Sequence, residues 1–161
     1  NLYVAFQTKD DQIVNRHTAD DTTLWEGDVV ELFIKPVARE DTYYEFQWAP
    51  NNARFDARFT GHRQPAWQTA AKFTAAIKHA VAIDGSVNDD TGDDRGWTVE
   101  AAIPWSAFGL SEAPKDGDIW FANMYRIDSK GTHNMAFMGA WAPVGGDFHQ
   151  LRDAGKFVFS R

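Results

Sequence analysis

The stretch Trp25–Ile34, with the sequence WEGDVVELFI, places a tryptophan in a turn directly before a strand. Successive side chains of a strand point to opposite faces. One face of this strand carries Val30, Leu32 and Ile34, and the other face carries Val29, Glu31, Phe33 and Lys35. Glu31 is therefore a carboxylate that lies between apolar neighbours on one face of a sheet.

A buried charge such as Glu31 costs several kcal/mol unless a partner compensates it. This face therefore holds either a structural ion pair, with Arg126 as the expected partner, or a carboxylate that meets a polar ligand beside an aromatic ring. Sugars suit the second arrangement, because their C–H faces stack on indole and their hydroxyls bind charged hydrogen-bond partners. The two interpretations are compatible, since a paired Glu31 and Arg126 can still offer hydrogen bonds to a diol.

The chain has 161 residues, and we interpret residues 1–161 as a single domain. It has no cysteine, so it offers neither a disulfide nor a thiolate zinc site. The formal net charge of −7 argues against nucleic acid or an anionic membrane surface as a partner. No apolar run reaches the roughly 18 residues that a membrane span needs. Aromatic residues make up 14% of the chain, which favours a solvent-facing aromatic site.

Short alternating runs separated by turn residues predict an all-β, antiparallel sandwich or barrel with little helix. Strands are expected near 1–7, 28–36, 42–50, 53–60, 72–83, 96–103, 118–127, 134–141 and 155–160. Single helical turns are expected at 106–108 and 150–154. Trp97 and Trp120 lie on apolar strand faces, which predicts that both belong to the core.

An acidic segment lies between two of these strands, at residues 88–94. Such residues commonly build a solvated turn. The alternative is a calcium loop, because several hard oxygen ligands occur close together in the sequence. The candidate ligands are Asp89, Asp90, Asp93 and Asp94.

Seven segments occur in a fixed order along the chain. They are NLYVAF at 1–6, LWEGDVVELFI at 24–34, YYEF at 43–46, GWTVEAAIPW at 96–105, FANMYR at 121–126, WAP at 141–143 and FH at 148–149. In this order they resemble the family 9 carbohydrate-binding modules and the wider group of family-9-like domains. The resemblance covers nearly the whole chain and lacks only the first strands of the usual domain. It implies a β-sandwich of jelly-roll type and a non-catalytic module that binds carbohydrate.

The resemblance also implies roles for individual residues. In characterised members two tryptophans clamp a sugar at the reducing end of a glycan. Trp25 matches the first of them, and Glu31 matches a glutamate that bonds sugar hydroxyls. The second position falls at Phe148 and His149, where the sequence departs from the family, because neither ring offers the stacking face of an indole. Trp141 is expected at the same end of the sandwich, as a further contact of the ligand.

The same resemblance implies the surroundings of the module. Characterised members are attached to xylanases, and calcium ions in them are structural. We therefore expect a secreted or periplasmic protein with a carbohydrate ligand, a structural calcium ion and a catalytic domain elsewhere in the parent chain.

Two alternatives remain open from the residues themselves. A glycoside hydrolase would use paired carboxylates, for which Glu31 with Glu45 or Glu100 are the candidates. A haem-binding or other cofactor-binding relative of the fold would need an axial histidine or methionine pair that faces a cavity. The candidates for that pair are Met124, Met135, Met138 and His149.

Overall fold

The computed structural model of the protein describes residues 1–36, 40–90, 92–131 and 134–160, and only the backbone of residues 134–136. The strands are β1 (Leu2–Lys9), β2 (Val29–Lys35), β3 (Tyr43–Trp48), β4 (Arg54–Phe59), β5 (Lys78–Asp84), β6 (Gly96–Ile103), β7 (Ile119–Lys130), β8 (Asn134–Ala140) and β9 (Gly155–Val158). The helical segments of the described residues are the α-helical turn α1 (Trp67–Ala70) and the 3-10 turns η1 (Leu24–Glu26), η2 (Trp105–Phe108) and η3 (Leu151–Asp153). The prediction of an all-β chain with little helix is confirmed.

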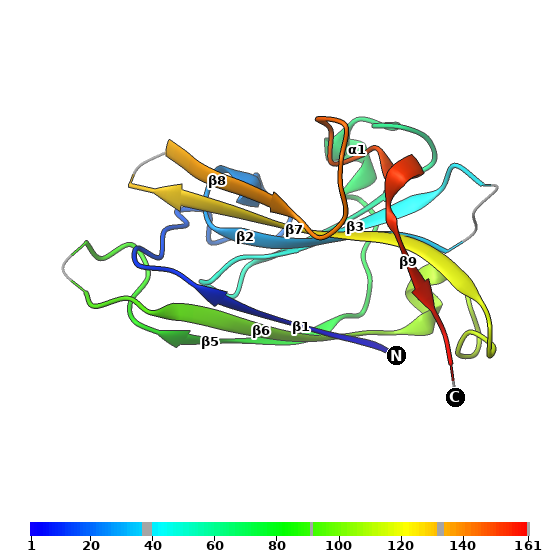
Figure 1. Ribbon diagram of the computed structural model, residues 1–161, viewed down its shortest axis with the longest axis horizontal. Helices are drawn as coiled ribbons and strands as arrows, with labels where there is room; N and C mark the ends of the chain where they lie inside the picture. The colour runs from blue at the N-terminus through cyan, green and yellow to red at the C-terminus, as the bar shows by residue number, and fades with distance from the viewer. Residues whose placement is uncertain (37–39, 91, 132–133, 161) are drawn as a thin grey trace.

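The strands form two antiparallel sheets that lie one above the other (Figure 1). The smaller sheet has the order β1-β6-β5, and the larger sheet has the order β4-β3-β2-β7-β8. β9 pairs with residues 119–122 of β7, whereas β8 pairs with residues 125–130 of that strand. Between β8 and β9 the chain leaves the sheet and passes over the face of the larger sheet that is turned away from the smaller one, as does α1 (Figure 1). The predicted β-sandwich is confirmed.

The main core lies between the two sheets. Alternation places Val30, Leu32 and Ile34 of β2 on the inner face, where they pack with Phe46 and Trp48 of β3 and with alternate residues of β6. Trp97 and Trp120 belong to this core and are 2% and 4% exposed, as their strand positions predict.

The outer face of the larger sheet is also apolar and buried. In many antiparallel sheets this face is in contact with solvent. Its cluster includes Phe33, Tyr43, Phe55, Phe59 and Tyr125. The segments that cover it are η1, α1, η3 and the loop after β8. Both faces of the larger sheet are therefore shielded, and a cavity can form between its outer face and this cover.

One predicted strand is shorter than the sequence suggests. The alternating run at 72–83 forms a strand only from Lys78, which pairs with Ala102 of β6. β6 ends at Ile103, directly before Pro104, so the preceding residues of the run have no strand to pair with. The alternation persists through residues 73–77 because that segment still packs apolar side chains against the core.

Candidate functional site

A cavity of about 500 Å³ lies on the outer face of the larger sheet. This volume is in the range of small-molecule sites. Its floor comes from β2, β3 and β4, and its walls come from η1, α1 and the loop between β8 and η3. The lining residues that matter for its chemistry are Trp25, Glu31, Glu45, Trp67, Phe148 and His149.

The polar floor follows from strand register. Residues that lie directly opposite each other in an antiparallel pair point to the same face. Glu31 of β2 lies opposite Gln47 of β3, and Phe33 lies opposite Glu45. Glu31, Glu45 and Gln47 therefore share the outer face, and all three line the cavity. They are 2%, 4% and 1% exposed, so two carboxyl groups and an amide are buried at its floor.

Trp25 forms one wall, and the turn that carries it is tightly braced. The buried side chain of Asn15 donates from Nδ2 to the carbonyl oxygens of Leu24 and Asp28, at 3.0 Å each. A Cβ at Gly27 would lie 2.7 Å from the Asn15 side chain, so only glycine leaves room for this brace. The Trp25 ring then meets Phe55 and Trp67 edge to face, with centroids 5.7 and 5.3 Å away.

We expect Gly27→Ala to lower the free energy of unfolding by about 2 kcal/mol, because the new methyl group must displace Asn15. The suitable control is Gly61→Ala, because the new Cβ would meet nothing closer than 3.8 Å. Gly109→Ala is a poor control, because the backbone of Gly109 has a positive φ. Urea denaturation of both variants measures the difference. Equal stability of Gly27→Ala and the parent protein would contradict this account of the turn.

The opposite wall is fixed by a buried asparagine at the point where β8 ends. Asn123 of β7 donates from Nδ2 to the carbonyl of Ala142 at 3.0 Å and accepts from the Ala142 amide at 2.9 Å. Further along the loop, Tyr125 donates its hydroxyl to the carbonyl of Phe148 at 2.8 Å. The Phe148 ring stacks on the Tyr125 ring with centroids 3.9 Å apart and 9° between the planes. The loop is therefore held over the cavity by residues of the sheet itself.

An ion pair closes the edge of the cavity. The Arg63 guanidinium donates to Asp147 at 2.8 and 3.2 Å, and His62 contacts the same carboxylate at 2.7 Å. Burial works against the charge of Asp147, but the hydrogen bonds from Arg63, from the His149 amide and from His62 hold the pKa of this carboxyl below its usual value. Arg63 is therefore engaged by Asp147.

His149 lies in the cavity wall with its ring positioned by Tyr43. The Tyr43 hydroxyl accepts from the Arg63 amide at 3.2 Å, so its own proton goes to Nδ1 of His149 at 2.7 Å. A neutral His149 then carries its proton on Nε2, which lies 3.9 Å from Oε2 of Glu45. Burial, with the charge of Arg63, lowers the pKa of His149 to about 4, so this ring is neutral near pH 7.

Both floor carboxyls resist ionisation. Burial raises the pKa of Glu45 to about 7, although a hydrogen bond from Gln47 works in the opposite direction. Burial, and then the proximity of Glu45, raise the pKa of Glu31 well above its usual value. Among the described residues, no hydrogen bond or ion pair holds the Glu31 carboxyl, which leaves it to the cavity.

The predicted ion pair between Glu31 and Arg126 does not form, and strand parity explains why. Arg126 lies opposite Val30, one residue out of phase with Glu31, so its side chain points to the inner face. There its guanidinium lies 3.1 Å from both Asp10 and Asp128. Arg126, predicted as a ligand contact, is therefore outside the cavity.

Trp141, also predicted as a ligand contact, lies elsewhere. Its ring is 53% exposed, packs on Phe157 of β9 with centroids 5.8 Å apart, and covers Gly155. It lines a shallow groove beside β1 and β7 that it shares with Arg126. Of the predicted ligand residues, the structure brings Trp25, Glu31, Phe148 and His149 together in one cavity.

Three of the predicted calcium ligands of the 88–94 loop, Asp89, Asp90 and Asp94, line one pocket at the surface. Both oxygens of Asp94 accept backbone amides, from Ser86 at 2.7 Å and Ile13 at 2.8 Å, and Asp90 accepts from Gln12 at 2.8 Å. These carboxylates brace the loop against the segment after β1. Neither they nor Asp89 and Asp93 belong to a group of three close carboxylates in the described part of the chain.

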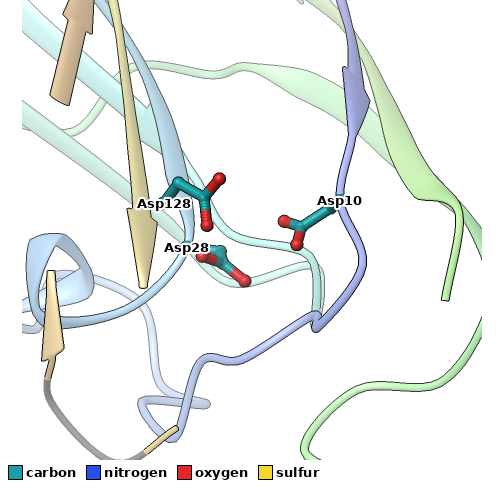
Figure 2. A group of neighbouring side chains, drawn as sticks. All are labelled: Asp10, Asp28 and Asp128. Carbon is teal, nitrogen blue, oxygen red and sulfur yellow. The ribbon is translucent and has the colours of Figure 1, made fainter. Parts of the chain in front are cut away.

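A different acidic group does converge. Oxygens of Asp10, Asp28 and Asp128 lie within 4.8 Å of one another, at the ends of β1, β2 and β7 (Figure 2). Asp28 accepts the amides of Val14 and Ser129 at 2.6 Å each, and burial raises its pKa to about 7. Sequence alone did not indicate this group, because its members are far apart in the chain.

The residues of the two alternatives are separated differently. Glu31 and Glu45 line the same cavity, whereas Glu100 lies exposed on β6 in the other sheet. Met124 lies opposite Leu32 and packs against the inner core, while Met138 lines the outer cavity. The side chain of Met135 lies outside the described residues.

A second cavity of about 490 Å³ lies on the far side of Tyr43 and His149. Its lining includes Lys35, Asp41 and Arg152, whose charges are at least partly in contact with solvent. Among the described residues that line this second cavity, no buried acid lacks a partner beside an aromatic wall. The cavity on the outer face of the larger sheet is therefore the better candidate for a specific site.

Sequence reasoning missed Gln47, Arg63, Trp67 and Asp147 as cavity residues. A signal for Gln47 was present, since Tyr44, Phe46 and Trp48 form the apolar half of β3 and leave Tyr43, Glu45 and Gln47 on the other face. Arg63, Trp67 and Asp147 lie in loops or in a short helical turn, where no periodicity reports the direction of a side chain.

The chain is thus an antiparallel β-sandwich with an aromatic cavity that has buried polar groups on its floor. The family described as carbohydrate family 9 binding domain-like matches residues 1–160, and the chain belongs to this family. As the sequence predicts, it is a carbohydrate-binding module and not a catalytic domain. None of the helical segments in the described residues is long and apolar enough to cross a membrane.

Individual proteins are similar to this chain in sequence or in fold. An extracellular protein of Arthroderma benhamiae is 28% identical over 98% of this chain and 73% of its own length. A protein from Bacteroides uniformis superposes with a TM-score of 0.73 at 20% identity, over 98% of this chain and 72% of its own. A family 9 carbohydrate-binding module of Caldicellulosiruptor kristjanssonii, solved with cellotriose, superposes with a TM-score of 0.64 at 16% identity, over 98% of this chain and 68% of its own. At such identities the superpositions establish the fold.

Proposed function

We propose that this module binds a sugar ring in the cavity on the outer face of the larger sheet. The observation that carries the proposal is Glu31, a buried carboxyl that faces the cavity between aromatic side chains and has no partner among the described residues. Burial of an unpartnered acid is costly, and such groups are kept where they serve a ligand.

Each part of the cavity has a role in this proposal. The indoles of Trp25 and Trp67 and the ring of Phe148 offer apolar walls for the C–H faces of the sugar. Glu31 and Glu45 accept hydrogen bonds from polar groups of the ring, and Nε2–H of His149 donates one. The relative solved with cellotriose shows that this fold can hold a glucose-based ligand.

Isothermal titration calorimetry of the chain against a panel of sugars tests the proposal. The panel contains glucose, xylose, glucosamine, N-acetylglucosamine, glucuronate and cellotriose. We expect at least one of them to bind, and Glu31→Gln to weaken that binding at least tenfold. Glu100→Gln on the smaller sheet is the matched control and should leave the affinity unchanged. If Glu31→Gln binds the sugar as tightly as the unsubstituted chain does, the site lies elsewhere.

The setting of the module is a further part of the proposal. We infer that the protein acts outside the cell, which the extracellular relative supports, and that it directs an attached catalytic domain to a polysaccharide. Fractionation of the native host for the intact parent protein tests both inferences. A parent protein confined to the cytoplasm would contradict the first.

A structural calcium ion belongs to the proposal as well, with Asp10, Asp28 and Asp128 as a second candidate site beside the 88–94 loop. The donor set fits calcium, because it consists of hard oxygens, and Oδ1 of Asp128 is buried without a hydrogen-bond partner. The Arg126 guanidinium, which now contacts two of these carboxylates, would have to make room for the ion.

We expect excess calcium to raise the melting temperature relative to chelator, because an ion that binds only the folded state stabilises it. Asp128→Asn should remove this difference, while Asp93→Asn in the acidic loop should retain it. The same melting temperature in calcium and in chelator for the parent chain would exclude the site. If Asp93→Asn removes this difference in melting temperature and Asp128→Asn retains it, the ion binds at the 88–94 loop.

A further inference from the structure

The floor of the cavity contains two buried carboxyl groups that have no cationic side chain paired with them among the described residues. Glu31 and Glu45 come from neighbouring strands, and burial separates both from bulk water. The charge of Arg63 acts on Glu45, but its guanidinium is paired with Asp147. His149 lies 3.9 Å from Glu45, but its ring is neutral near pH 7. Within the described residues, the two carboxyls therefore have no cation of their own.

We propose that the sugar bound here carries a protonated primary amine, as a 2-amino-2-deoxyhexose does, and that its ammonium group lies between Glu31 and Glu45. The inference rests on the proposed function and names the class of sugar that fits the same cavity. The pyranose ring then lies against the aromatic walls, and the ammonium group supplies the missing positive charge.

The count of hydrogen-bonding groups supports an ammonium group. It has three N–H donors and no acceptor. The residues of the floor offer three acceptors: the Glu31 carboxyl, the Glu45 carboxyl and Oε1 of Gln47. The last of these is buried without a hydrogen-bond partner in the described structure, because Nε2 of the same side chain donates to Glu45. An ammonium group therefore has one donor for each of the three acceptors.

Other sugars leave this floor unsatisfied. A hydroxyl has a single donor and no charge, so a neutral sugar brings fewer donors to the floor and cannot balance the charge of an ionised carboxyl there. An N-acetyl group has one N–H donor and brings a carbonyl acceptor to a floor that already has an excess of acceptors. A uronate brings a negative charge of its own to a floor that already holds two buried acids. Aromatic walls also favour a cation, since the face of an indole attracts positive charge.

The proposal makes binding depend on pH through these two acids. The pKa of Glu45 is raised to about 7 and that of Glu31 is raised above its usual value, so both hold protons in mildly acidic solution. An entering ammonium group balances one negative charge, so one of the two carboxyls ionises and the pair releases about one proton as the sugar binds. Affinity for the amine therefore rises as the pH rises toward 7, until the amine itself loses its proton.

Other titratable groups near the floor do not change charge in that range. Burial raises the pKa of Tyr43 and of Tyr125 above the usual tyrosine value, so both stay neutral. Asp147 stays ionised against Arg63, and His149 stays neutral above pH 5. His62 contacts Asp147 from the neighbouring cavity and is tested separately below.

Calorimetry with glucosamine, glucose and N-acetylglucosamine tests the inference, at pH 5, 6 and 7 and in two buffers that differ in ionisation enthalpy. We expect glucosamine to bind at least tenfold more tightly than either neutral sugar at pH 7. Its affinity should rise about tenfold from pH 5 to pH 6, with about one proton released per sugar bound. The affinity for glucose should change less than threefold over the same range.

Variants assign the effect to the floor. Glu45→Gln should weaken glucosamine binding at least tenfold and remove most of the proton release, so that the preference for glucosamine over glucose is lost. His62→Gln should retain both the selectivity and the pH profile. Melting curves identify any variant that is not folded, and Glu31→Gln serves as the second floor variant in that case.

The outcomes separate the two proposals. If glucose binds as tightly as glucosamine, or if glucosamine binds without a pH dependence, the inference is wrong and the sugar-binding function stands. If no sugar of the panel binds at any pH, the proposed function fails together with the inference.

Discussion

Glu45→Gln should make the protein more stable at pH 7.5, by about 3 kcal/mol. In the folded chain burial raises the pKa of Glu45 from its ordinary value of 4.5 to about 7. The folded state therefore binds a proton that the unfolded state has released, and stability falls as the pH rises from about 4.5 to 7. A shift of this size corresponds to about 3 kcal/mol, at 1.36 kcal/mol per pKa unit.

Glutamine at position 45 removes this loss of stability at neutral pH, because it has the same shape as glutamate and no charge to bury. At pH 4, where Glu45 is protonated in both states, the gain should vanish. Urea denaturation at pH 4, 5.5 and 7.5 measures the effect. The matched control is Glu100→Gln, whose exposed side chain should change stability by less than about 0.5 kcal/mol at any of these values. A gain of equal size at all three would show that charge is not its cause.

This stability prediction and the proposed function point in opposite directions for the same residue. A carboxyl that weakens the folded state at neutral pH is a cost without benefit in a purely structural protein. It is expected at a binding site, where a ligand supplies the interactions that burial removed. Glu45→Gln is therefore predicted to be more stable and less able to bind an amine.

Period-two patterning was sufficient to predict the sandwich and to identify Glu31 as an acid on an apolar face. The same patterning failed for Arg126, because the sequence of one strand says nothing about its register with the next. A shift of one residue turns a side chain to the other face. Arg126 meets the inner-face acids Asp10 and Asp128, and Glu31 is left without the predicted partner.

The walls of the cavity could not be predicted in the same way. Phe148 and His149 were found through a family resemblance, whereas Trp67 and Arg63 approach the site from a helical turn and a loop. Asn123 shows how such placement arises, since a single buried amide fixes the direction of the loop after β8. Its role depends on a partner 19 residues away in the sequence, which no local pattern reveals.

Trp25→Ala should weaken sugar binding at least about 100-fold, a loss in the range of binding hot spots. It should also lower the free energy of unfolding by about 3 kcal/mol. A turn position favours an exposed indole that could be removed without loss of stability, but the structure shows a half-buried ring that meets Phe55 and Trp67 edge to face. Removal of the ring leaves a gap beside the cavity, and Trp67 loses its support.

Two comparisons separate the effect on binding from the effect on folding. Trp25→Phe fills much of the gap and should recover most of the stability, yet its smaller ring should leave affinity at least tenfold below that of the parent chain. Trp141→Ala removes an indole that is 53% exposed and lies outside the cavity, so it should change affinity less than twofold. Calorimetry at a temperature where each variant is fully folded gives the affinities, and urea denaturation gives the stabilities. If Trp141→Ala abolishes binding and Trp25→Ala does not, the sugar lies in the groove beside β1 and β7, and the acidic floor under Trp25 has another role.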